Sequence, residues 1–164
     1  MDKQEIFDTV VTHLFTQRKQ AMDKRTDACV YRARGGLKCA VGCLIPDKLY
    51  HRCLEGMTPS QMASSDPTSF SNDPSSMRQR AKYAPPVAAL LGETNISLLD
   101  ALQSAHDYEA NWDAPHHTAQ DLTPMRERGA SALWESLLGT AREYKLKQKV
   151  LRKYRHTTVT PAWS

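Results

Sequence analysis

Residues 29–53, CVYRARGGLKCAVGCLIPDKLYHRC, hold all four cysteines and the densest apolar run of the chain. Two short runs with strand-forming residues, CVYRA and LKCAV, flank the pair Gly35-Gly36, and this arrangement predicts a β-hairpin. The second run also has a helical interpretation, in which Cys39 opens a short helix that Pro46 stops. We expect extended chain up to about Cys39 and helix after it.

Helices are predicted on both sides of this stretch. Apolar residues at positions 6–15 recur at spacings of one, three and four, which indicates an amphipathic helix over about residues 2–22. Asn95 can cap a second helix with a similar pattern. The pair Thr123-Pro124 is a typical cap and first residue of a third helix, which continues toward Tyr144. Residues 58–86 are rich in serine, proline and polar side chains, so a long surface loop with one helical turn near residues 60–63 is predicted there.

The sequence therefore predicts a mainly α (α+β) fold. We expect a single domain of about five helices with a small β-hairpin or extended segment near residues 28–40. A chain of 164 residues fits one domain that can bury most of its apolar surface. Residues 1–144 would form this globular domain, with the long loop at residues 58–86, and residues 145–164 would form a basic C-terminal extension.

The net charge of +4 is concentrated near the end of the chain. Between positions 142 and 155 only Glu143 opposes seven basic residues, Arg142, Lys145, Lys147, Lys149, Arg152, Lys153 and Arg155. Lysine and arginine neutralise phosphates, and tyrosines between them can stack on bases. The segment predicts an interface for nucleic acid or an acidic partner. A solvated helix end is the alternative, because the helix dipole favours cations there.

The double-glycine turn is a second candidate site. Its backbone amides and the neighbouring cations can hold a phosphate or nucleotide, and the residues concerned are Arg32, Arg34, Gly35, Gly36 and Lys38. A hairpin also uses two glycines for geometry alone. The chain contains no P-loop and no G-x-G-x-x-G motif.

A third candidate lies between positions 106 and 117, where imidazoles and carboxylates crowd together. These groups bind zinc, manganese and iron, so the candidate ligands of a divalent metal are His106, Asp107, His116 and His117. A metal-dependent enzyme is therefore one hypothesis, although the spacing matches no H-E-x-x-H motif. A polar loop anchored by Trp112 explains the same residues. No other cofactor is predicted, and the cysteines, which lack zinc-knuckle spacing, are interpreted mainly as small core residues. A metal site on Cys39 and Cys43 with His51, and a reactive thiol at Cys39, are the alternatives.

Cellular location and protein class follow from what the sequence lacks. No apolar run approaches the roughly 18 residues that span a bilayer, and the first residues lack the apolar stretch of a signal peptide. We expect a cytoplasmic protein without a membrane partner, whose thiols stay reduced. No Ser-His-Asp or G-x-S-x-G pattern occurs, so a binding protein is favoured over an enzyme.

The stretch CVYRARGGLKCAVGCLIPDKLY resembles one that recurs in small proteins of bacteriophage and prophage genomes. The shared pattern is a cysteine, Tyr-Arg, a glycine turn, K-C-A-V-G-C-L-I-P-D and an aromatic residue, and the resemblance covers residues 29–56 well. KQEIFDTVVTHL and LLDALQSAHD are similar more loosely. The resemblance implies a phage-encoded accessory protein in the bacterial cytoplasm and transfers no functional residue. Such a protein is expected to bind and inhibit or modulate a host factor, a defence protein or a signalling nucleotide.

Overall fold

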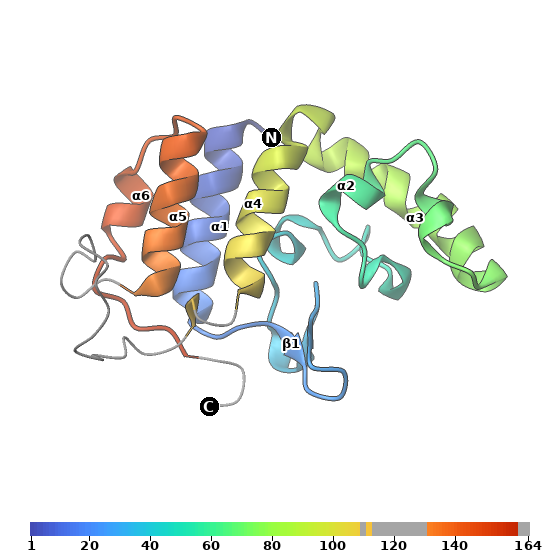
Figure 1. The fold of residues 1–164 in the computed structure, drawn as a ribbon, viewed down its shortest axis with the longest axis horizontal. Helices are drawn as coiled ribbons and strands as arrows, with labels where there is room; N and C mark the ends of the chain where they lie inside the picture. Colours follow the sequence, from blue (N-terminus) through green and yellow to red (C-terminus); the bar gives the residue numbers. More distant parts are fainter. Residues whose placement is uncertain (109–110, 113–130, 161–164) are drawn as a thin grey trace.

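The computed structural model describes residues 1–108, 111–112 and 131–160, and their mainly helical fold with one small sheet confirms the predicted fold class (Figure 1). The α-helices of these residues are α1 (Lys3–Gln17), α2 (Pro59–Met62), α3 (Pro74–Leu91), α4 (Ile96–Asp107), α5 (Ala132–Glu143) and α6 (Lys149–Arg152). Short 3-10 turns lie between them, η1 (Arg34–Gly36), η2 (Gly42–Leu44), η3 (Arg52–Leu54), η4 (Pro67–Phe70) and η5 (Glu93–Asn95). None of the described helices is long and apolar enough to cross a membrane.

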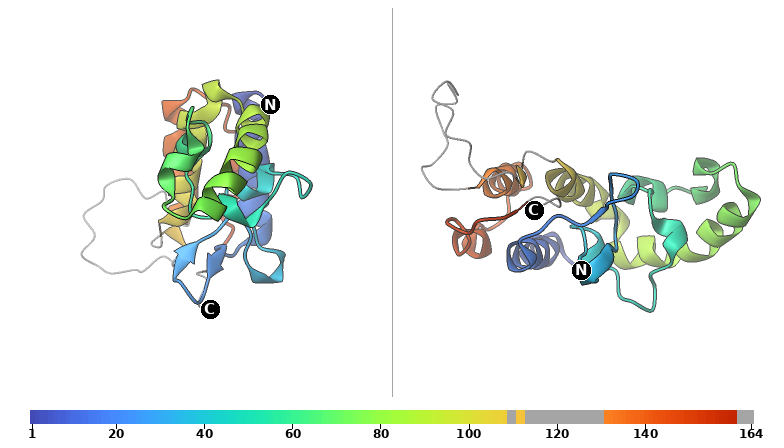
Figure 2. Two further views of the ribbon diagram at one scale, coloured as in Figure 1. Left: turned by 90° about the vertical axis from the view of Figure 1, so that its right-hand side faces the viewer. Right: turned by 90° about the horizontal axis from the view of Figure 1, so that it is seen from below.

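Helices α1, α4, α5 and α6 lie side by side, as Figures 1 and 2 show from three directions. Their buried faces form one core together with residues of η2, α2 and α3. Helix α1 carries the predicted apolar stripe, and its buried residues are Ile6, Phe7, Val10, Val11, Leu14 and Phe15. The helix ends at Gln17, short of the predicted residue 22. Arg18 adopts a left-handed conformation with φ 55°, and its N–H donates to the Leu14 carbonyl, which closes the helix.

The small sheet lies earlier in the chain than the predicted hairpin. β1 (Met22–Asp23) pairs antiparallel with β2 (Ala28–Cys29). Gly35 and Gly36 do turn the chain, since both have positive φ and an antiparallel bridge joins Arg32 to Lys38. The Ala33 N–H donates to the Leu37 carbonyl across the turn over 2.9 Å, but the pairing stays a single bridge among the described residues. The outward N–H groups of Arg32 and Lys38 donate instead to Glu55 and Gln17. The helix predicted after Cys39 is present only as η2.

The predicted long loop at residues 58–86 is wrong for most of its length. Thr58 and Gln61 form a capping box that starts α2, which agrees with the helical turn predicted near residues 60–63. Asp73 caps α3, with Pro74 in the first position, where its missing N–H costs nothing. The serine, aspartate and proline residues that suggested a loop are therefore the residues that begin helices in this segment.

Residues 145–160 also differ from the predicted extension, because they pack on the domain through the buried side chains of Leu151 and Val159. A left-handed Lys145, with φ 54°, separates α5 from α6. Leu151 is 0% exposed, and the Trp134 indole donates to its carbonyl over 2.9 Å. The Thr160 N–H donates to the Arg18 carbonyl over 2.8 Å. The helix start predicted at Thr123-Pro124 lies outside the described residues, and Ser131 caps α5.

Candidate anion-binding cleft

A cleft of about 860 Å³ opens between the β1–β2 hairpin, the double-glycine turn and the segment around η3. Six basic and two acidic residues line it. The basic residues are Lys19, Lys24, Arg25, Arg32, Arg34 and Arg52. This volume lies within the range of roughly 300–1,000 Å³ that is usual for small-molecule sites. Met22, Val30 and Leu37 add apolar surface to the walls.

Both carboxylates of the cleft are already engaged. Asp23 accepts a hydrogen bond from the Arg25 N–H and pairs with its guanidinium at 3.5 Å, and these contacts lower the pKa of Asp23. Glu55 accepts from the N–H of Tyr31 over 2.7 Å and that of Arg32 over 3.1 Å. The Tyr50 hydroxyl also donates to Glu55, over 2.7 Å. Asp23 is therefore engaged mainly by Arg25, with a weaker attraction to Arg34, and Glu55 is engaged by three donors.

The arginines and lysines of the cleft fall into two groups. Arg32 is held in place, with Nη1 2.5 Å from Asp47, Nη2 2.5 Å from the Ile45 carbonyl, and the guanidinium 4.9 Å from the Tyr50 ring centre. Its Nε is buried and has no hydrogen-bond partner among the described residues. In contrast, Lys24, Arg34 and Arg52 are exposed and form no ion pair within the described part of the chain. These three cations are available to a ligand.

The structure brings together only part of the phosphate site predicted at the glycine turn. Arg32 and Arg34 line the cleft, whereas Lys38 does not and lies 3.5 Å from Asp47. Gly35 and Gly36, with φ of 76° and 79°, serve the turn and do not line the cleft. Sequence reasoning missed the other four cations, Lys19, Lys24, Arg25 and Arg52. The adjacent pair Lys24-Arg25, in the loop of the hairpin, was the available signal.

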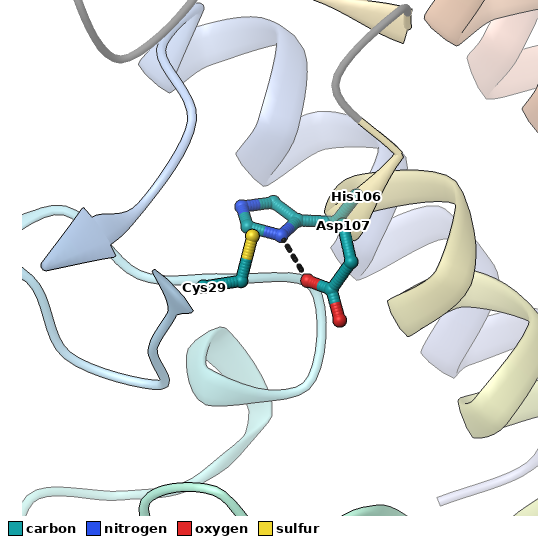
Figure 3. A group of neighbouring side chains, drawn as sticks. All are labelled: Cys29, His106 and Asp107. Atoms are coloured by element: carbon teal, nitrogen blue, oxygen red, sulfur yellow. Dashed lines mark hydrogen bonds and ion pairs between the residues drawn. The ribbon is translucent and has the colours of Figure 1, made fainter. Parts of the chain in front are cut away.

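Cys29, which the sequence did not indicate as a metal ligand, lies beside His106 and Asp107 (Figure 3). One possible ligand atom from each residue lies within 4.8 Å of the others. His106 Nδ1 is 2.9 Å from Asp107 Oδ1, and Nε2 is 3.1 Å from the Ala21 nitrogen. An amide N–H only donates, so Nε2 accepts and the ring proton sits on Nδ1, facing Asp107. The other two predicted ligands, His116 and His117, lie outside the described residues.

These hydrogen bonds give a structural role to the group of Cys29, His106 and Asp107, called the His106 cluster below. Metal ligation through Nδ1 would move the proton to Nε2, where it would face the Ala21 N–H. Desolvation and the nearby Asp107 carboxylate raise the pKa of Cys29 well above its usual value, so the thiol stays protonated and is a poor nucleophile. The His106 carbonyl accepts from Gln20 over 3.0 Å and from the Trp112 indole over 2.6 Å. The cluster thus ties the end of α4 to the chain entering β1, and metal binding stays a prediction.

The basic residues at positions 142–155 lie on a different surface, over α5 and α6. Six of the seven are exposed, and Arg155 is half-buried. The Lys147 backbone exchanges hydrogen bonds with the Gln4 side chain, over 2.7 and 3.0 Å, which holds the segment on α1. None of these seven residues lines the cleft. The basic C-terminal segment and the cations of the cleft are therefore distinct sets of residues.

Comparison with protein-family models, curated proteins and solved structures finds no match for this chain. Its function is therefore inferred from the geometry and charge of its own residues. The resemblance to bacteriophage proteins stays a prediction.

Proposed function

We propose that the protein binds a phosphate-bearing anion in the cleft beside the β1–β2 hairpin. The observation that carries this proposal is the excess of cations, since six basic and two acidic side chains line the cleft. Asp23 pairs with Arg25 and Asp47 pairs with Arg32, whereas Lys24, Arg34 and Arg52 form no ion pair within the described residues. Arginine binds phosphate through paired N–H donors, and lysine binds it as a point charge. A concave surface lined by one sign of charge also concentrates oppositely charged ligands.

The side chains that line the cleft suit binding of a ligand better than catalysis of a reaction. Cys29 is the only thiol among its lining residues, and its raised pKa keeps it protonated. No histidine is among the described residues that line the cleft. Capture of a phosphate-bearing host ligand would suit the accessory role that the bacteriophage resemblance implies, because occupying such a ligand inhibits the process that depends on it.

Isothermal titration with inorganic pyrophosphate tests the cleft. We expect Arg34→Ala and Arg52→Ala each to weaken binding about tenfold, because each removes a charge-assisted hydrogen bond to phosphate. Lys48→Ala is the matched control, since Lys48 is exposed and close in sequence but does not line the cleft. Absence of pyrophosphate binding by the unmodified protein would contradict the proposal. Equal losses in the Lys48 variant would contradict it too.

The surface over α5 and α6 favours a second candidate function, non-specific nucleic-acid binding. Truncation after Tyr144 would remove the buried Leu151 and Val159, so charge reversal of exposed residues is the better test. We expect affinity for single-stranded DNA to fall steeply between about 50 and 200 mM salt. The combined variant Lys145→Glu, Lys149→Glu and Lys153→Glu should flatten that dependence. Arg34→Ala, in the cleft, should leave it unchanged, and an unaltered salt slope in the triple variant would reject this candidate.

A further inference from the structure

We infer that the ligand of the cleft carries a chain of at least three linked phosphate groups, an inference that rests on the proposed phosphate binding. The cleft is much larger than one phosphate group. Its volume is about 860 Å³, whereas a water molecule, with one heavy atom, occupies about 30 Å³. The cleft therefore has room for several phosphates, and the positions of its cations indicate how many of them are bound.

Three exposed cations line the cleft from three separate segments of the chain. Lys24 lies in the loop of the β1–β2 hairpin, Arg34 begins η1 at the double-glycine turn, and Arg52 begins η3. None of the three forms an ion pair within the described part of the chain. Like charges around one cleft repel each other, and a ligand with several linked negative charges offsets this repulsion for all of them at once.

Arg34 and Arg52 lie on two walls of the cleft that hydrogen bonds join. The Glu55 carboxylate, which directly follows η3, accepts from the N–H groups of Tyr31 and Arg32 over 2.7 and 3.1 Å. This contact holds η3 beside the chain that leads to Arg34. Two linked phosphates can therefore contact both arginines, and each guanidinium offers paired N–H donors to one of them.

Lys24 belongs to a third wall, which the hairpin forms. Its loop joins the paired strands Met22–Asp23 and Ala28–Cys29. Within this wall the Arg25 guanidinium pairs with Asp23 at 3.5 Å, whereas Lys24 is exposed and forms no ion pair with a described residue. Lysine binds phosphate as a point charge. A third phosphate, linked to the two at the arginines, would therefore be contacted by Lys24.

Isothermal titration of the unmodified protein with orthophosphate, pyrophosphate and tripolyphosphate, without divalent metal ions, tests the inference. We expect affinity to rise about tenfold from pyrophosphate to tripolyphosphate, because the third phosphate adds a charge-assisted hydrogen bond. Similar affinities for pyrophosphate and tripolyphosphate would overturn the inference and leave phosphate binding in place. Failure of all three to bind would overturn both proposals.

The variant Lys24→Ala tests the contact between the hairpin and the third phosphate. We expect it to bind tripolyphosphate about tenfold more weakly than the unmodified protein does, and pyrophosphate equally well. Lys48→Ala is the matched control, since Lys48 is exposed but does not line the cleft. A Lys24→Ala protein that keeps its full affinity for tripolyphosphate, or that loses affinity for both ligands equally, would reject the role of Lys24.

Linked phosphates occur both as inorganic polyphosphate and in nucleoside triphosphates, and titration with ATP distinguishes these sources. An affinity for ATP close to that for tripolyphosphate would show that the phosphate chain alone is recognised. A higher affinity for ATP would identify a nucleoside triphosphate as the ligand. Weaker binding of ATP than of pyrophosphate would overturn the inference, because ATP carries the same three linked phosphates.

Discussion

Gly42→Ala is expected to destabilise the protein by about 3 kcal/mol, at the upper end of overpacking costs. Gly42 is buried at the start of η2, and a Cβ atom there would lie 2.2 Å from the Tyr31 carbonyl oxygen and 2.9 Å from its carbon. These are backbone atoms, and the Tyr31 N–H is bound to Glu55, so the clash cannot be relieved by rotating a side chain. Urea unfolding monitored by circular dichroism measures the change.

Gly139→Ala is the matched control for this substitution. Gly139 lies in α5, is exposed, and a Cβ there would meet no atom within 4 Å. Alanine in a helix interior is favoured over glycine by about 1 kcal/mol, so this variant should be more stable than the unmodified protein. A Gly42→Ala protein that unfolds at the urea midpoint of the unmodified protein would contradict the close approach of η2 to Tyr31.

Leu151→Ala is expected to cost about 2–5 kcal/mol, the usual range for removing a leucine side chain from a core. Leu151 is 0% exposed, and its carbonyl receives the Trp134 indole N–H, so α6 closes the core beside α5. The same unfolding measurement checks this prediction.

Lys153→Ala controls for general effects of substitution in this segment, because Lys153 is exposed two residues away. We expect it to change the free energy of unfolding by less than about 0.5 kcal/mol. If Leu151→Ala costs no more than this control, residues 145–160 behave as an extension outside the domain, as the sequence suggested.

Helices were predicted correctly where the spacing of apolar residues indicated them. The apolar stripe of α1 is buried as predicted, and Asn95 directly precedes α4. The predicted capping by Asn95 is absent, because its side chain makes no hydrogen bond to the first turn of α4. It donates instead to the Leu91 and Met1 carbonyls. Composition misled at residues 58–86, because serine, aspartate and proline are common both in loops and at helix starts.

The sequence by itself determined the helical fold class, the buried face of α1 and the chain reversal at Gly35 and Gly36. Each of these depends on near neighbours, whose spacing is visible in the chain. Only the tertiary structure decided the candidate sites. Arg52 joins the cations of the hairpin, and Cys29 and Glu55 adjoin Asp107, through packing between distant segments. The charge of a cleft is the sum of the charges that folding brings together from distant parts of the chain. A local sequence pattern therefore cannot predict that charge.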